Sequence, residues 1–434
     1  MGRIALYGAG GSPYHHAAIL GRDGHDLRFV FPVDIQAGAL ESFDAFVMPG
    51  GGYRAMAGQL EPLGVAGCRA IREYVESGGM YIGSCAGSYD AAVVPARFLD
   101  MCPEQAEMCM VDARVWNHGE SMFGVLQSPG IGELVAETLA PDHPVMTGLP
   151  AQFRVTHYNG PLFTGGTPLA RVVGTTEQFT PAEEFLGASD GPRLIDRAIE
   201  AGVNNVVAGQ HGHGRVVLFG SHPEFGSSLT MDDVGEAAAL LRNAVAWQLS
   251  AAHDVARPTR TVLTDAQIPT QQRERDLASL TQLVDRLTRH CANLDQYTER
   301  SAWLAPAVAM SMFGRSAREV WAAALQRIPE LAAQAAAAAP SVAPALLSFR
   351  PTGQAVDGGF HGVAPLLVQA DELLVQAAIA LEQPAPPAVE DPYGAMRESP
   401  YHLVAGSYLA AVGRVTSASL LTRMSGNDRV LAAA

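Results

Sequence analysis

The stretch that most constrains the fold of this chain is the pentapeptide at residues 83–87, Gly-Ser-Cys-Ala-Gly. It follows an apolar run at residues 79–82 that predicts a buried strand, and it precedes residues 88–92, which predict the start of a helix. A cysteine between small residues at a sharp strand-to-helix turn has the form of a nucleophile elbow. Because the helix N-terminus favours thiolate over thiol, the pattern predicts an α/β fold in which Cys85 attacks an acyl carbon.

A base for this cysteine follows a second apolar run. Residues 215–220 predict a buried strand, and His222 and Glu224 come just after it. We expect both side chains beyond the carboxyl end of that strand, where open α/β sheets build their sites. An imidazole there can take or share the thiol proton, and a carboxylate can fix the tautomer of the ring and stabilise the imidazolium.

A glycine-rich turn follows a third predicted strand. Residues 43–48 form the strand, and Pro-Gly-Gly-Gly-Tyr follows at residues 49–53. Because glycine has no Cβ, the backbone N–H groups of such a turn can approach a developing oxyanion closely. The sequence therefore predicts an oxyanion hole beside the cysteine.

Four segments, taken in order, resemble the class I glutamine amidotransferase superfamily over roughly residues 1–250. The closest resemblance is to the branch named after the N-terminal domain of biotin-protein ligases. The segments that carry the resemblance are Met-Pro-Gly-Gly-Gly at 48–52, Gly-Ser-Cys-Ala-Gly-Ser-Tyr at 83–89, His-Tyr-Asn-Gly-Pro at 157–161 and Gly-Ser-His-Pro-Glu at 220–224.

The resemblance implies a role for each residue of the site. Cys85 is expected as the nucleophile, His222 as the base and Glu224 as the carboxylate that orients the base. The oxyanion hole is expected from three backbone N–H groups, those of Gly51, Gly52 and Ala86.

Five further side chains are candidates for binding substrate. Two belong to the 157–161 motif, one follows the elbow, and two lie after a strand predicted at residues 3–8, at the sheet edge where Cys85 is expected. The two histidines also fit a structural role as polar residues at a helix start, and the two residues of the 157–161 motif also fit a strand-end turn. These candidates are His15, His16, Tyr89, Tyr158 and Asn159.

Composition excludes several classes of function. The net charge of −15 argues against nucleic acid and anionic membranes as partners. The chain has no lysine, which excludes a P-loop lysine, a Schiff-base lysine and a biotin-accepting lysine. Its five cysteines lack paired zinc spacing, so we expect free thiols, no metal and a reducing compartment. With no signal peptide apparent and no long apolar run, the expected location is the cytoplasm, and no cofactor is expected.

The organisation changes along the chain. Residues 1–254 alternate short strands with helices, which predicts a flavodoxin-like, doubly wound, mainly parallel sheet. Residues 255–269 are expected to form a linker, and residues 270–434 an all-α domain for which we recognise no family. Within the last part, helices are predicted at 270–299, 300–313, 315–338, 361–382 and 399–424.

These features favour a cysteine-dependent amidohydrolase or acyl-transfer enzyme that forms a thioester from an amide or ester, in a small molecule or on a carrier. One alternative is a glutaminase that supplies ammonia to a partner enzyme. Tyr89 stands where glutaminases usually carry a polar residue such as Gln, and no synthetase module shares the chain, so another acyl substrate is preferred. A second alternative is a binding or regulatory module with an idle triad. The helical part is expected to cover the site edge or to dock a protein partner.

Overall fold

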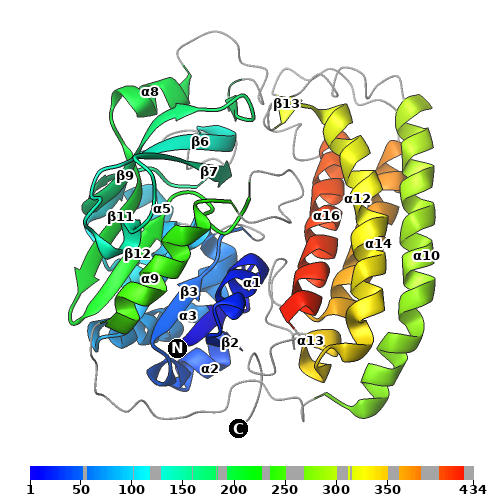
Figure 1. Ribbon diagram of the computed structural model, residues 1–434, viewed down its shortest axis with the longest axis horizontal. Coiled ribbons are helices and arrows are strands. Elements are labelled where there is room, and N and C mark those ends of the chain that lie inside the picture. The colour runs from blue at the N-terminus through cyan, green and yellow to red at the C-terminus, as the bar shows by residue number, and fades with distance from the viewer. Residues whose placement is uncertain are drawn as a thin grey trace.

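A computed structural model describes most of the chain, and Figure 1 shows an α/β part beside a helical part. The described residues are 1–51, 56–100, 102–117, 129–158, 160–181, 183, 193–226, 235–250, 268–300, 311–312, 315–349, 361–382 and 400–424.

Five parallel strands form the part of the sheet that carries the predicted site. They lie in the spatial order β2-β1-β3-β4-β12. This is the flavodoxin-like order, with the first strand between the second and the third. The expected fold class is therefore confirmed. The strands are β1 (Arg3–Tyr7), β2 (Asp26–Val30), β3 (Ala45–Met48), β4 (Met80–Ser84) and β12 (Gly214–Phe219).

Beyond β12 the sheet continues in antiparallel strands, in the order β12-β11-β9-β6-β10, with β7 beside β6 and with β5 and β8 at the side of β11. The sequence did not predict β6, which begins with two glycines at φ 143° and 134°, Gly130 and Gly132, against the backbone of residues 178–180. These strands are β5 (Ala113–Val115), β6 (Gly130–Thr138), β7 (Gln152–Tyr158), β8 (Phe163–Gly165), β9 (Thr167–Thr175), β10 (Thr180–Pro181) and β11 (Asn204–His211).

Both faces of the parallel strands are covered. Side chains of β1 alternate, so that Ile4 and Leu6 join one buried cluster and Ala5 and Tyr7 join another. The first cluster includes α1 (Tyr14–Arg22) and α9 (Ala238–Ser250), and the second includes α3 (Met56–Glu76). The sheet is thus doubly wound. The smaller elements of this part are α2 (Pro32–Gln36), η1 (Ala39–Ser42), α4 (Ala86–Ala91), α5 (Ala96–Leu99), α6 (Gln105–Met108), η2 (Pro144–Met146) and α8 (Leu194–Glu200).

Four long helices make up most of the helical part, and each was predicted from the sequence to within a few residues. They pack side by side around a buried apolar interior (Figure 1). They are α10 (Thr270–Arg300), α12 (Ala317–Ala338), α14 (Val363–Leu381) and α16 (Pro400–Met424). The shorter elements are η4 (Ala339–Ser341), α13 (Pro344–Ser348) and the paired β13 (Ser311–Met312) and β14 (Arg315–Ser316).

Two sequence predictions fall mainly on residues that the structure does not describe. Residues 301–310 of the helix predicted at 300–313 are outside the described part, and residues 311–312 form β13 rather than helix. The linker predicted at 255–269 is described only from residue 268. The domain boundaries therefore stay a prediction.

The helical part contacts the α/β part at the carboxyl ends of the first two strands. Helix α16 packs against α1, which follows β1 (Figure 1). The backbone N–H of His361 donates to the hydroxyl of Tyr14 at 2.9 Å, and the rings of Phe31 and Phe349 lie 5.2 Å apart. None of the described helices combines the length and the apolar character needed to cross a bilayer.

Candidate active site

Cys85 occupies a sharp turn between β4 and α4. Its backbone has φ 49° and ψ −110°, and it is the only residue other than glycine with a positive φ in the described part of the chain. Such a conformation costs of order 1–3 kcal/mol and persists only where the surroundings enforce it. A Cβ on Gly87 would lie 2.2 Å from the carbonyl oxygen of Met48, so α4 can pass β3 this closely only with glycine there. The turn therefore has the backbone strain and the close helix approach that a nucleophile elbow requires, and its role stays a prediction.

The turn is held by hydrogen bonds to the neighbouring strand. The N–H of Cys85 donates to the carbonyl of Phe219 at 2.9 Å, and the hydroxyl of Ser88 lies 2.8 Å from the same carbonyl. The Cys85 side chain is 7% exposed, and its Sγ lies 3.3 Å from the carbonyl oxygen of Tyr158. The sulfur is therefore fixed in a nearly closed site.

His222 and Glu224 reach the same edge of the sheet as Cys85. Strand β12 runs parallel to β4 with Phe219 opposite Ser84, so the residues after both strands emerge together. The N–H of His222 donates to the carbonyl of Thr156 at 2.7 Å, and its Nδ1 lies 2.7 Å from Oε1 of Glu224. Because Nδ1 contacts Glu224, Nε2 is the ring nitrogen that remains for another partner, and the expected role of His222 as the base of Cys85 stays a prediction.

Gly50 packs directly against both His222 and Cys85. A Cβ on Gly50 would lie 2.6 Å from Cε1 of His222 and 2.7 Å from Cβ of Cys85. The glycine turn after β3 therefore passes directly over the cysteine and the imidazole, and no larger residue fits at this position.

The charges of the buried pair support one another. Burial opposes the charged imidazolium, but attraction to Cys85 and Glu224 outweighs burial and raises the pKa of His222 from 6.5 to about 10. Burial also opposes the carboxylate, but His16 and His222 lower the pKa of Glu224 to about 2. At neutral pH His222 is therefore a cation held beside Cys85 by an ionised Glu224.

The predicted oxyanion hole is described in part. Gly51 follows the close-packed Gly50 and is exposed, with φ 79°. Ala86 is the first residue of α4, so its N–H has no acceptor within its own helix and can donate to a substrate oxygen. Gly52 lies outside the described residues. The three N–H groups stay a prediction.

Two of the candidate substrate-binding residues, Tyr89 and Tyr158, lie on the sheet side of the site. Tyr89 is buried, and its hydroxyl accepts a hydrogen bond from Nδ2 of Asn117 at 3.1 Å. Tyr158 is partly exposed and contributes the carbonyl that contacts the Cys85 sulfur. Asn159 lies outside the described residues.

The other two candidates lie in the first turn of α1, buried beside Glu224 and Phe225. His16 is 0% exposed, and its Nε2 lies 3.0 Å from Oγ of Ser84 and 3.5 Å from Oε2 of Glu224. The ring of His15 meets Phe225 edge-on at 4.6 Å. Phe225 in turn stacks on His222, with centroids 4.4 Å and planes 8° apart.

Sequence reasoning missed three residues that hold the site: Ser84, Asn117 and Phe225. Phe225 directly follows the His-Pro-Glu motif, and an aromatic residue there was a readable signal for a ring that covers the imidazole. Asn117 donates hydrogen bonds to the hydroxyl of Tyr89 and the carbonyl of Gly160 and accepts one from the N–H of Leu162. No local sequence pattern predicts these contacts.

No group of three or more His, Cys, Asp or Glu side chains within the described residues has the arrangement of a metal site.

The chain was compared with known proteins. A family model described as the N-terminal part of biotin-protein ligase matches residues 40–97, which contain the glycine turn and the Cys85 elbow. The resemblance to this branch is therefore confirmed over that segment. The search of curated proteins found no match.

Several solved structures are similar at low identity. PurLQS from Thermotoga maritima is 12% identical, with 57% of this chain and 98% of that chain covered and a TM-score of 0.37. A thua-like protein from Parabacteroides merdae is 17% identical, with 60% and 95% covered and a TM-score of 0.36. A thua-like protein from Bacteroides uniformis is 14% identical, with 57% and 91% covered and a TM-score of 0.35.

Proposed function

We propose that this protein is a cysteine-dependent amidohydrolase or acyl-transfer enzyme that works through a thioester on Cys85. The observation that carries the proposal is the convergence, at one sheet edge, of a strained cysteine and a buried His222–Glu224 ion pair. Backbone strain at a nucleophile that lies beside an oriented base is typical of enzymes that form a covalent intermediate. The glutamine amidotransferase-like fold and the match at residues 40–97 agree with this chemistry.

In the first half of the reaction, Sγ of Cys85 attacks the carbonyl carbon of an amide or ester. A C–S bond forms, the carbonyl π electrons move to oxygen, and the predicted N–H groups of Gly51, Gly52 and Ala86 stabilise that charge. His222 is already protonated because of its raised pKa, so it donates its proton to the leaving nitrogen or oxygen. The C–N or C–O bond breaks, and the thioester remains.

In the second half, His222 is neutral and removes a proton from water or from an acceptor amine. The oxygen or nitrogen attacks the thioester, the C–S bond breaks, and sulfur leaves as the thiolate beside the reformed imidazolium. Glu224 keeps the ring in the tautomer that presents Nε2 throughout.

We prefer a substrate other than free glutamine. Tyr89 stands after the elbow and is buried, with its hydroxyl committed to Asn117. We propose that the protein acts in the cytoplasm. All five cysteines are described and each is a free thiol, which supports a reducing compartment. The helical part, at the same edge of the sheet, is proposed to narrow the approach to Cys85 or to receive a protein partner.

The test is turnover of a panel of acyl substrates, glutamine included, by four forms of the protein. Cys85→Ala and His222→Ala should each reduce turnover by roughly a million-fold, and Glu224→Gln by roughly ten-thousand-fold, as in triads where the orienting acid matters less than the base. Mass spectrometry of the wild type should show an acyl group on Cys85. Retention of turnover by Cys85→Ala would overturn the proposal, and robust hydrolysis of glutamine by the isolated protein would move it to the ammonia-supplying class.

A further inference from the structure

The geometry points to His16 as a positioning residue of the proposed triad. Its Nε2 lies 3.5 Å from the second carboxylate oxygen of Glu224, so that each oxygen of this buried carboxylate meets one imidazole. This inference rests on the proposed function, because it concerns the residue that holds the orienting acid rather than the reacting atoms.

The buried carboxylate of Glu224 needs a hydrogen-bond donor at each of its oxygens. Glu224 is 1% exposed, and its Oε1 is taken by Nδ1 of His222 at 2.7 Å. Its Oε2 is buried and makes no hydrogen bond of ordinary length within the described residues. A buried carboxylate oxygen without a donor is costly. The group that faces it is Nε2 of His16 at 3.5 Å, a distance that a small movement of either side chain would close.

The charge of His16 suits this role. Burial lowers the pKa of His16, the negative charge of Glu224 raises this pKa, and the positive charge of His222 lowers it. The sum of these effects leaves the pKa of His16 below its ordinary value. Glu224 and His222 are the titratable groups whose charge acts on it, and the remaining contacts are Oγ of Ser84 and the backbone of Ser12. A neutral imidazole gives Glu224 a donor without adding a second cation that would compete with His222 for the same carboxylate.

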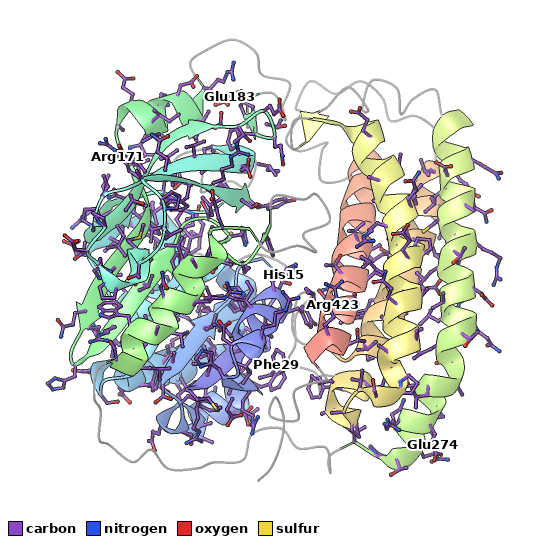
Figure 2. All side chains as sticks on the ribbon, viewed as in Figure 1. His15, Phe29, Arg171, Glu183, Glu274 and Arg423 are labelled. Atoms are coloured by element: carbon purple, nitrogen blue, oxygen red, sulfur yellow. The ribbon has the colours of Figure 1, made fainter. Side chains whose placement is uncertain are left out.

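The position of His16 ties the triad to the helical part. It stands in the first turn of α1, two residues after Tyr14, whose hydroxyl accepts from the backbone N–H of His361 at 2.9 Å. Figure 2 shows His15, the residue between them, on the side of the α/β part that faces the helices. The helices thus brace the turn of α1 from which His16 reaches Glu224.

The experiment measures the rate at which iodoacetamide alkylates Cys85 in the full chain, as a function of pH, by peptide mapping. In His16→Leu, Glu224 loses its second partner and supports the His222 cation less well. We expect alkylation near pH 7 to slow by about tenfold, with the profile displaced to higher pH, because hydrogen bonds to charged groups contribute at least this much. His16→Gln keeps an N–H near the same place and should recover most of the rate.

His25→Leu is the matched control. His25 is another imidazole of this part, and its Nδ1 accepts from the N–H of Gly2 at 3.1 Å, away from the triad. Its loss should leave the alkylation profile unchanged. A folded His16→Leu variant that alkylates as the wild type does at every pH would overturn the inference. Failure of the proposed function would look different, as a wild-type Cys85 that is unreactive or dispensable.

A second measurement needs only wild-type protein with ¹⁵N-labelled histidine, so it stands even if His16→Leu does not fold. The inference requires a neutral His16 ring with its proton on Nε2 between pH 6 and 8. The nitrogen chemical shifts, assigned with His16→Gln, report the tautomer directly. A ring protonated on Nδ1 alone contradicts the inference, because Nε2 would then present a lone pair to the carboxylate.

Discussion

At the scale of single residues, the site depends on a buried ion pair whose members stabilise each other's charge. The pKa of Glu224 falls to about 2, so its contribution to stability is complete above about 4.5 and is lost as the pH falls through about 2. The pKa of His222 rises to about 10, so its contribution is complete below about 6.5 and is lost as the pH rises through about 10. Both contributions are complete together only between about pH 4.5 and 6.5.

This pair predicts how stability responds to alkaline pH. Between pH 6.5 and 10 the wild type should lose free energy of unfolding as His222 gives up its proton. In Glu224→Gln the imidazolium has lost its carboxylate, so the loss over the same interval should be smaller. Urea unfolding at several pH values measures both slopes. Equal slopes would show that the carboxylate does not set the charge of His222.

At the scale of elements, the parallel strands and the long helices were predictable because their apolar periodicity is regular. The sharp turn at Cys85 was predictable because small residues on both sides of a cysteine, directly after a buried strand, are what a strand-to-helix turn requires. Strand β6 was not predictable, because Gly130 and Gly132 interrupt the apolar pattern at its start. The close packing of these glycines against residues 178–180 depends on the tertiary structure and leaves no local signal in the sequence. The same holds for Asn117, whose three partners come from separate segments.

The close passage of α4 over β3 gives a prediction about the elbow. In Gly87→Ala the new methyl would lie 2.2 Å from the carbonyl oxygen of Met48, so α4 must shift. We expect a loss of about 2–4 kcal/mol in the free energy of unfolding, together with slower alkylation of Cys85. Gly413→Ala is the control, because Gly413 lies in α16 and a Cβ there would meet nothing within 4 Å. That change should be neutral or stabilise by up to about 1 kcal/mol, and equal effects at both sites would contradict the account.

At the scale of the whole molecule, the main result is the place where the helices dock. The sequence predicted that they cover the edge that carries the site or dock a partner there, and their contacts lie at the ends of β1 and β2, through Tyr14 and Phe31. The sequence could not specify this surface. Residues 415–422 of α16 are buried in succession, so no polar face of that segment marks which side meets the α/β part.

Truncation tests whether this docking matters to the reaction. A chain that ends at Ser250, the last residue of α9, retains every strand of the large sheet. We expect it to fold, with lower stability, and to show altered substrate selectivity or lost turnover, because the first turn of α1 loses its support. Circular dichroism checks the fold, and turnover of the acyl panel checks selectivity. Full activity with unchanged selectivity would exclude the helices from the site.

The central claim is that Cys85 is the activated nucleophile, and the relative reactivity of the five cysteines tests it most directly. Burial raises the pKa of Cys102 and Cys291 to about 12 and also raises those of Cys68 and Cys109, so these remain thiols at neutral pH. Cys85 instead lies beside a cationic His222. Peptide-mapped alkylation with iodoacetamide at pH 6–7 should label Cys85 first, and His222→Ala should remove that preference. Equal or slower labelling of Cys85 in the folded wild type would contradict the account.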